Sequence, residues 1–494
     1  MQNRRLLIFS LLLLFLAFAV SPLINLTDTT EGRYATIGRD MAAGGDYITP
    51  MVWHSGRHFP YLGKPPLQFW MIATSINMFG ANEFAARLPS FLAAALLLIL
   101  LYEIMRRYID PETVGLAACI LTACPFFFVY SATVIVDMTL TLFVGAAVCF
   151  QIALMNEKTK ARQTVWSLGV FAALALGMLT KGPIAVIIFG FPVLLWSLWN
   201  RTWLAFKHHR WIYGILLFAA ICFPWFFMAE KHNPGFLRYF FINENLMRYI
   251  SHNYGDRYGT GHSHMRGTAL LYLVYGCLPW FIWAGTLMVK KGFRPLADAI
   301  WKDRNLQFLF LGSLGYVVFL CLARQLTPTY LLPVIPWVAV CLAACMRRFK
   351  IPAARVQAVA GVLVVLYVSG LLVAAPFINS HNSSKQVIEF IREHHMDGPL
   401  YFVGKTPGTA YFYGEKLISS HPSEHANTSI YNTIDDPTND LYVIKDRYLK
   451  RLSPENLEHL SPAGRAGVYT LYIKKALISE PYPRSGYPAG SGLP

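Results

Sequence analysis

The sequence predicts a polytopic all-α membrane protein with about 11 or more transmembrane helices, followed by a small C-terminal α/β domain outside the membrane. Three observations support this fold class. The 494-residue chain is 55% hydrophobic and only 14% charged, whereas about a quarter of the residues of a soluble domain are charged. Apolar runs of about 20 residues, long enough to cross a bilayer, recur through the first three quarters of the chain. After residue 378 they stop, and short strand-like and helix-like segments follow.

The predicted spans share a length close to the thickness of a bilayer and carry few charged residues. They cover residues 6–24, 84–105, 113–131, 134–155, 164–180, 183–199, 211–229, 268–289, 306–323, 329–346 and 356–378. Two long connections, 25–83 and 230–267, interrupt the series. We therefore expect one transmembrane domain, residues 1–378, with two large loops.

Basic residues alternate along the connections between the spans. One set of alternate connections is rich in Lys and Arg, as in Arg106/Arg107, Lys290/Lys291 and Arg347/Arg348. The other set includes the two long loops, where bases are sparser and mixed with acids. The positive-inside rule then predicts a multi-pass protein of the cell inner membrane with a cytoplasmic N-terminus. Both long loops and everything after residue 378 lie on the outer, periplasmic side. The net charge of +16 is thus explained by topology, and no nucleic acid partner is expected.

The first span has an alternative interpretation. Ala19–Ser21 fits the small-x-small pattern of a signal peptidase site, so this span could be a cleaved signal peptide. We favour an uncleaved anchor, because no later element would hold the acidic stretch after it so close to the membrane.

Residues 379–494 predict the small α/β domain. "KQVIEFIREHH" has helical spacing, and "PLYFVG", "DLYVIK" and "GVYTLYIKK" have the composition of short strands. The last residues, "PYPRSGYPAGSGLP", are rich in Pro and Gly and predict a disordered tail. Two roles stay open for this domain: a cap that contacts the acceptor, or passive stabilisation.

Residues that commonly bind metals give no firm site. All eight cysteines lie inside predicted spans, so we expect neither a disulfide framework nor a thiolate metal site. His252, His262 and His264 cluster in the second long loop. An exposed polar loop is the favoured interpretation of this cluster over a metal site.

The first long loop concentrates acids beside the membrane. Asp28, Glu31 and Arg33 follow the first span directly. "TTEGRYATIGRDMAAGG" predicts a short amphipathic helix, with Gly44-Gly45 ending it and an apolar stripe able to lie on the membrane. "YLGKPPLQFWMIATSINMFG" then places Lys64 before a rigid Pro-Pro and a second amphipathic segment. The two amphipathic segments are expected to lie along the bilayer on either side of these charges. This arrangement suits a site for a lipid-borne substrate.

Further ionisable or hydroxyl-bearing residues are predicted at the same face, close to membrane depth. They are Asp137, Lys181, Glu244, Arg248, Arg257, Arg324 and Tyr330. Charged groups within spans are unfavourable and tend to be functional. The alternative for each is a structural one, namely a helix cap, a span-end anchor or a buried pair.

These residue types together suit one kind of chemistry. Lys and Arg neutralise a phosphate, and a tyrosine hydroxyl adds a donor. A carboxylate can act as general base on an acceptor hydroxyl, or can stabilise the positive charge that develops at a sugar carbon. Together these side chains suit a reaction in which a group is transferred to an acceptor and a phosphate is the leaving group.

Several motifs contain these residues or lie beside them. They are "TTEGRYA", "GDYITP", "GKPPLQFW", "FGANEFAARLPS", "TKGP", "NENLMRY" and "TYLLPVIP". Through them the chain resembles the membrane glycosyltransferases of the GT-C superfamily. The similarity is to the branch that contains the lipid A aminoarabinose transferase and the protein O-mannosyltransferases. The resemblance implies a polyprenyl-phosphate sugar donor, chemistry at the outer face and an inverting single displacement.

The resemblance also implies roles for individual residues. Lys64, Arg248 and Tyr330 are the expected phosphate contacts. Asp28 and Glu31 are the expected catalytic acids. Independently of the resemblance, the pattern of charges at the outer face adds five residues to the predicted substrate site: Arg33, Asp137, Lys181, Glu244 and Arg324.

The sequence departs from the pattern of that branch at three places. The usual "DE" pair is Thr30-Glu31 here, with the aspartate displaced to Asp28, and the "EKP" motif is Gly63-Lys64-Pro65. The "EH" pair is Glu244-Asn245, without the histidine. We therefore assign no metal ligand and no certain cofactor, and a divalent metal stays an open alternative.

The resulting hypothesis is an inner-membrane glycosyltransferase that uses a polyprenyl-phosphate sugar, either hexosyl or pentosyl. Its acceptor would be a lipid resembling lipid A, a glycan or a protein. Within the first loop we predict Asp28 as the base, with Glu31 orienting Arg33 or Lys64. The alternative function is a transporter or flippase for a lipid-linked sugar, although the charges lie at the rim of the membrane and no internal repeat is visible.

Overall fold

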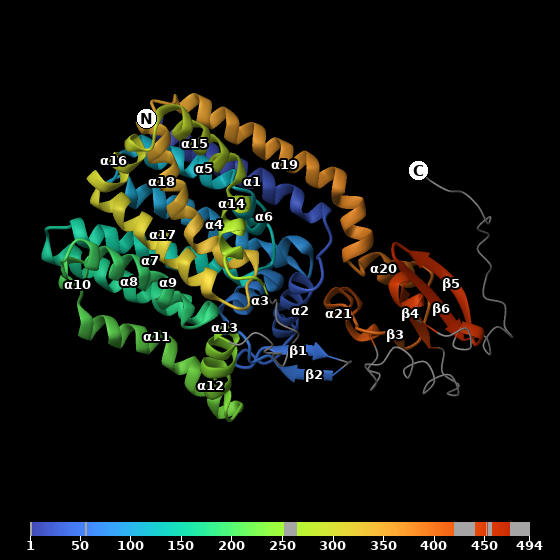
Figure 1. Cartoon of the computed structure of the whole chain (residues 1–494). Coiled ribbons are helices and arrows are strands. Elements are labelled where there is room, and N and C mark those ends of the chain that lie inside the picture. The colour runs from blue at the N-terminus through green and yellow to red at the C-terminus, as the bar shows by residue number, and fades with distance from the viewer. Residues whose placement is uncertain are drawn as a thin grey trace. The chain divides into compact units, whose positions relative to one another are not determined.

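The computed structural model describes residues 2–54, 57–250, 264–418, 440–450, 452 and 457–474 (Figure 1). They fall into two compact units. The first comprises Met1–Ile24, Ile37–Met51 and Pro60–Ala374. The second comprises Asn25–Thr36, Val52–Phe59 and Ala375–Pro494. Parts of the first loop thus belong to the second unit, while the predicted domain boundary at residue 378 stays a prediction.

The first unit is built from long apolar helices. In the described part of the chain eight are long and apolar enough to cross a membrane. They are α1 (Gln2–Val20), α4 (Glu83–Met105), α7 (Val136–Asn156), α8 (Lys160–Lys181), α11 (Trp211–His232), α17 (Arg304–Leu322), α18 (Ile335–Arg348, preceded by the 3-10 helix η3, Pro328–Val334) and α19 (Ala353–Asn382).

Two further spans are broken. α5 (Pro111–Thr122) and α6 (Pro125–Ser131) meet at 69°, and α14 (Thr268–Gly276) and α15 (Leu278–Lys291) meet at 94°. A proline opens α6 and another stands in the first turn of α15, where the missing N–H and the ring prevent a continuous helix. With the shorter α9 (Ile184–Trp199), every predicted span coincides with a helix or a bent pair.

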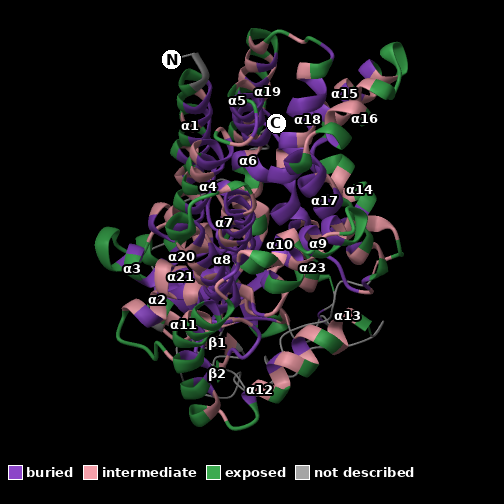
Figure 2. Cartoon of the chain, turned by 90° about the vertical axis from the view of Figure 1, so that its left-hand side faces the viewer, coloured by how far each residue is buried: buried purple, intermediate pink, exposed green. Residues whose placement is uncertain are grey.

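Burial divides these helices into inner and outer members. In the apolar window of α7, 83% of the residues are buried, against 22% in α19, and Figure 2 shows the buried residues concentrated along α7, α17 and α18. Gly145 of α7 permits close packing on α4, since a Cβ there would stand 2.6 Å from Leu97 Cδ1. α7 therefore lies in the core of the bundle.

Shorter elements connect the spans. They are α2 (Thr30–Ala42), β1 (Met51–His54), β2 (Arg57–Pro60), α3 (Leu67–Phe79), α10 (Leu204–Lys207), α12 (Phe236–Arg238), the π-helix η2 (Tyr239–Met247), α13 (Arg248–Ile250) and α16 (Arg294–Lys302). α2 begins and ends where the sequence predicts. Its apolar stripe does not face outward toward a membrane as expected, because Tyr34, Ile37 and Met41 are all buried within the protein.

The second unit contains a four-stranded mixed sheet in the order β3-β4-β6-β5. Its strands are β3 (Leu400–Phe402), β4 (Leu441–Lys445), β5 (Leu460–Ala466) and β6 (Tyr469–Lys474), and its helices include α20 (Lys385–Glu393), α21 (Gly408–Gly414) and α23 (Asp446–Leu449). β3 runs parallel to β4, and the other pairs are antiparallel. α20 contributes Val387, Ile388 and Ile391 to its core.

These elements confirm the predicted fold class, a polytopic all-α membrane protein with a small α/β region near the C-terminus. The predicted helix and three predicted strands of that region are present as α20, β3, β4 and β6. β5 was not foreseen. The predicted disordered tail, 481–494, lies outside the described residues, and the orientation of the termini stays a prediction.

Candidate functional site

The first cluster of the candidate site joins two loops of the first unit. Lys64 precedes α3, and Glu244 lies in η2. Lys64 Nζ contacts Glu244 Oε1 at 2.6 Å and donates to the carbonyl of Gly63 at 2.7 Å. Arg248, one turn further, places Nη1 2.7 Å from the same carboxylate oxygen. Two cations therefore share one oxygen, and the cluster carries one net positive charge.

The electrostatics of this cluster keep Lys64 charged. Burial by itself lowers the pKa of Lys64, but Glu244 and nearby phenols outweigh it, so the pKa lies above its ordinary value. The second carboxylate oxygen of Glu244 is buried and has no hydrogen-bond partner in the described part of the chain. An ionised group buried in this way is stable only with strong partners, and here both partners converge on one side of the carboxylate.

The second cluster lies where α7 begins and α8 ends. Asp137 in the first turn of α7 forms an ion pair with Lys181, the last residue of α8. The Lys181 Nζ lies 4.0 Å from the centre of the Tyr330 ring, a cation–π contact. The Tyr316 hydroxyl donates to the carbonyl of Tyr330 at 3.0 Å and fixes its backbone.

The packing of η2 against the end of α8 brings the two clusters together. The residue after Lys181 is Gly182, whose φ of +87° favours glycine, and a Cβ there would stand 2.5 Å from Phe240 Cζ of η2. The element that carries Glu244 thus packs directly on the end of α8. Tyr330 also lies close enough to Lys64 to affect its pKa. We call Lys64, Asp137, Lys181, Glu244, Arg248 and Tyr330 the cation site.

Arg324 lies beside this site. Its backbone N–H donates to the carbonyl of Tyr249, the residue after Arg248, at 3.2 Å. Its half-buried side chain has no ion pair or hydrogen bond within the described residues. Its guanidinium is therefore available to an anion. His252, Arg257 and His262 lie outside the described residues.

Asp28, Glu31 and Arg33 belong to the second unit. Asp28 Oδ1 accepts from the backbone N–H of Thr409 at 2.8 Å, and Oδ2 accepts from the Thr409 hydroxyl at 2.8 Å. Burial raises the pKa of Asp28, and the bonds from Thr409 partly oppose this. Glu31 Oε2 accepts from the N–H of Thr27 at 3.1 Å and from its hydroxyl at 2.8 Å. Hydrogen bonds from a neutral threonine thus hold each of these acids.

Sequence reasoning missed two residues. Thr409 is fully buried and is 381 positions from Asp28, so no local pattern links them. Gln68 is also fully buried, and its Oε1 accepts from the hydroxyl of Thr139 at 2.5 Å. This bond joins α3, four residues after Lys64, to α7, two residues after Asp137. A lone glutamine inside the apolar "LQFWMIA" was a signal that could have identified it.

The described residues contain no group of three or more His, Cys, Asp or Glu side chains placed to hold a metal ion. Asp137 and Glu244 are each engaged by cations. The described part of the cation site therefore offers no complete donor set for a metal.

Comparisons with known proteins agree with the resemblance seen in the sequence. Residues 63–227 match the family model described as dolichyl-phosphate-mannose-protein mannosyltransferase. An undecaprenyl phosphate-alpha-4-amino-4-deoxy-L-arabinose arabinosyl transferase of Pseudomonas paraeruginosa (strain DSM 24068 / PA7) is 31% identical over 345 residues. That match covers 67% of this chain and 58% of the relative. The chain thus spans less than two thirds of the length of this relative.

Solved structures give the same result for the fold. The crystal structure of ArnT from Cupriavidus metallidurans bound to undecaprenyl phosphate superposes with a TM-score of 0.73 and 20% identity, covering 96% of this chain and 98% of that one. The apo structure of the same protein gives a TM-score of 0.74. The chain therefore has the GT-C fold of the aminoarabinose transferases and is related to that branch of the membrane glycosyltransferases.

Proposed function

We propose that the protein is a glycosyltransferase of the cell inner membrane that acts at the outer face. It moves a hexosyl or pentosyl sugar from a polyprenyl-phosphate donor to a lipid resembling lipid A, a glycan or a protein, by inverting displacement. The observation that carries this proposal is the convergence of Lys64 and Arg248 on a single oxygen of Glu244. The names of the relatives, and the undecaprenyl phosphate bound to ArnT in its crystal structure, support this donor class.

The cation site suits a phosphodiester. A donor phosphate can take the place of Glu244 between Lys64 and Arg248, because a phosphate oxygen offers the same kind of acceptor. The hydroxyl of Tyr330 and the guanidinium of Arg324 are the further donors we assign to it. As the sugar leaves, negative charge grows on this phosphate. Cations held in place therefore stabilise the transition state more strongly than they stabilise the bound donor.

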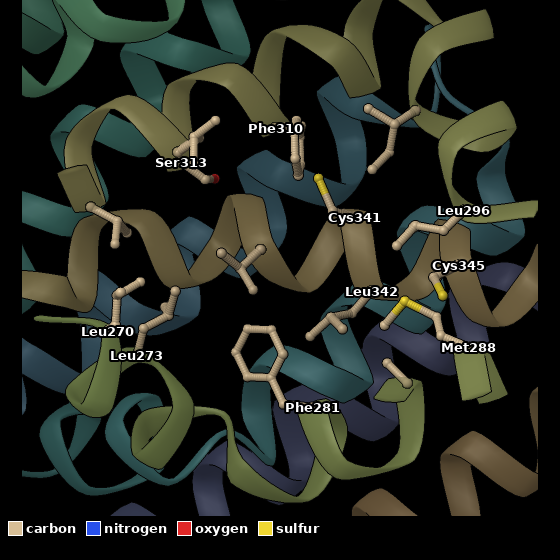
Figure 3. A pocket seen from close by; sticks show the side chains of 15 residues that line it. Leu270, Leu273, Phe281, Met288, Leu296, Phe310, Ser313, Cys341, Leu342 and Cys345 are labelled. Carbon is tan, nitrogen blue, oxygen red and sulfur yellow. The ribbon is translucent and has the colours of Figure 1, made fainter. Parts of the chain in front are cut away.

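An apolar cavity in the same unit offers room for a hydrocarbon chain. It measures about 220 Å³ and is lined by side chains of α14 to α18, among them Leu273, Phe281, Phe310 and Leu342 (Figure 3). Ser313 is the one hydroxyl among the lining residues. We assign this cavity to part of the donor's polyprenyl chain. A hydrocarbon chain can fill an apolar lining of this kind without leaving buried polar groups that lack hydrogen bonds.

The acids of the first loop have separate proposed roles. Asp28 is the general base that takes the proton of the acceptor hydroxyl. Burial raises its pKa, which makes the carboxylate a stronger proton acceptor than an exposed aspartate. Glu31 holds the start of α2 through Thr27 and so maintains the position of Arg33. The alternative is that Glu31 is the base and Asp28 the structural acid, and mutation of each residue distinguishes the two assignments.

Purified protein in liposomes, supplied with radiolabelled polyprenyl-phosphate sugars and membrane acceptors, tests the proposal. We expect transfer of label with at least one donor and weaker donor binding in Arg248→Ala. An absence of both transfer and donor binding across a broad panel would refute the proposal. Lipid scrambling that persists in an Asp28→Ala/Glu31→Ala variant would favour the transporter instead.

A further inference from the structure

A second cavity, lined mainly by polar side chains, lies at the end of the first unit away from the cation site. It measures about 680 Å³ and forms where the connection after α4 meets the connection between α7 and α8. Its lining includes Arg107, Tyr108, Glu157, Lys158, Arg162 and Trp166. The proposed donor site uses none of these residues.

The cavity and the cation site lie at opposite ends of α7. Asp137 stands in the first turn of this 21-residue helix, and Asn156, its last residue, borders the cavity. At 1.5 Å per residue α7 is roughly 30 Å long, which is about the thickness of the hydrocarbon core. The cavity therefore opens at the other face of the membrane.

The cations around this cavity have few partners among the described residues. Arg107 and Lys158 are exposed, and their side chains have no hydrogen bond or ion pair in the described part of the chain. Arg162 Nη1 comes no closer than 3.9 Å to Glu157 Oε2, and its side chain is 73% exposed. Three positive charges thus surround the cavity, and among the described residues only Arg162 has a counterion, at the outer limit of an ion pair.

The one acid among the lining residues is directed elsewhere. Glu157 Oε1 accepts from the backbone N–H groups of Lys158 and Thr159, both at 3.0 Å. The bond from Thr159 is the main reason that the pKa of Glu157 lies below its ordinary value. Glu157 is therefore ionised and acts as a cap for its own loop, so the cavity keeps a surplus of two positive charges.

One wall of the cavity is apolar. Val165 is 64% exposed, and Trp166 stacks on Phe150 with ring centres 5.8 Å apart. The buried Nε1 of Trp166 has no acceptor among the described residues. Tryptophan and tyrosine beside basic residues are characteristic of the level where lipid headgroups meet the acyl chains.

We propose that this cavity binds the phosphate headgroup of an anionic membrane lipid. Arg107, Lys158 and Arg162 contact the phosphate, while Val165 and Trp166 lie against the glycerol and the first part of the acyl chains. Basic pockets between transmembrane helices bind such headgroups. A lipid fits better than a free phosphate ion, because a free ion would make no use of the exposed apolar wall. This inference does not depend on the proposed catalytic function.

Native mass spectrometry and thermal unfolding of the full-length protein in detergent test the inference. Cardiolipin, phosphatidylglycerol, phosphatidylcholine and inorganic phosphate are titrated separately. The test variant is Arg107→Ala/Lys158→Ala/Arg162→Ala. The matched control, Lys207→Ala/Arg294→Ala/Arg355→Ala, removes the same number of exposed Arg and Lys side chains, none with a side-chain partner in the part of the chain that the structure describes.

We expect cardiolipin and phosphatidylglycerol to bind and to raise Tm in the wild type and the control. The test variant should bind them at least about tenfold more weakly, since each cation near an anionic surface contributes several-fold. Equal binding by the two triple variants would overturn the inference. Protection by inorganic phosphate equal to that by cardiolipin would overturn the assignment to a lipid. Should the test variant misfold, Arg162→Glu alone, at a largely exposed side chain, must show the same selective loss.

Discussion

The cation site and the Asp28 region hold their carboxylates in different ways. In the first unit Glu244 is held by two charged partners at 2.6 and 2.7 Å. In the second unit Asp28 is held by the amide and the hydroxyl of one neutral threonine, each at 2.8 Å. Glu31 likewise accepts from a neutral threonine. The first arrangement places a carboxylate between two cations that can change partners, and the second holds Asp28 through two uncharged hydrogen-bond donors.

This difference indicates what each region can do. A cation that is paired with a resident carboxylate can exchange that partner for a phosphate, because both are anionic acceptors. The bonds from Thr409 fix the geometry of the Asp28 carboxylate and lower its pKa against the raising effect of burial, and both effects favour the ionised form that a general base requires. Variants that remove one partner at a time should separate these two roles, with effects that range from loss of turnover to a small change in affinity.

Asp28→Asn should abolish turnover while leaving donor binding intact. The amide keeps the shape of the side chain but cannot take a proton, and loss of a general base typically lowers the rate by about 10²–10⁴-fold. Single-turnover transfer and donor Kd, measured on the same preparation, check this. A normal rate for Asp28→Asn together with an inactive Glu31→Gln would reverse the two roles. Normal rates for both would make the first loop purely structural.

Lys64→Ala should mainly weaken donor binding. A hydrogen bond to a charged group contributes about 1.5–3 kcal/mol, so we expect a rise in donor Kd of roughly 10- to 100-fold with a smaller change in the rate of bound donor. Lys231→Ala is the matched control, because Lys231 is exposed and its side chain has no partner within the described residues. An unchanged Kd in Lys64→Ala would remove the phosphate contact from the proposal.

Thr409→Ala should shift the pH profile of transfer. The bonds from Thr409 lower the pKa of Asp28 against the raising effect of burial, so loss of the hydroxyl should raise this pKa further. A general base acts in its deprotonated form, and the acidic limb of the rate profile should therefore move to higher pH. We expect a loss of rate of about tenfold at neutral pH. Thr409→Ser, which keeps the hydroxyl, should restore the profile. A uniform loss at every pH would indicate a structural role only.

Arg324→Gln should have the smallest effect. Its side chain has no partner in the described structure, so stability should change by less than about 0.5 kcal/mol. Donor affinity should fall by roughly fivefold, in a salt-dependent way, because the variant removes one charge near the proposed phosphate. Identical donor titrations of variant and wild type at low salt would exclude Arg324 from the site.

The spans were predictable because hydropathy is a local property of the sequence. Each predicted segment coincides with a helix or a bent pair, whereas the bends themselves depend on how Pro125 and Pro279 are accommodated in the bundle. The short β5 was missed, since "LSPAGRA" has few β-branched or aromatic residues. It becomes a strand through pairing with β6.

The residue types of the candidate site were predictable, but their partners were not. Lys64 and Glu244 are 180 positions apart, so their contact follows from the packing of η2 on the end of α8 through Gly182. The buried stripe of α2 shows the same limit, because an amphipathic pattern does not specify whether protein or lipid covers the apolar face. Asp28 was identified as an acid of interest, while its contact with Thr409 required the folded second unit.

Glu244 has a consequence for the end of the proposed catalytic cycle. In the proposed cycle, the spent polyprenyl phosphate would still lie between Lys64 and Arg248 after sugar transfer, and it would carry more negative charge than the donor did. A site of bare cations would retain it and slow every later turnover, as product release often limits such enzymes. Glu244, held within reach of both cations, competes for them as soon as the phosphate moves. Under this proposal, the resident carboxylate would limit the affinity for the product and let the emptied carrier leave.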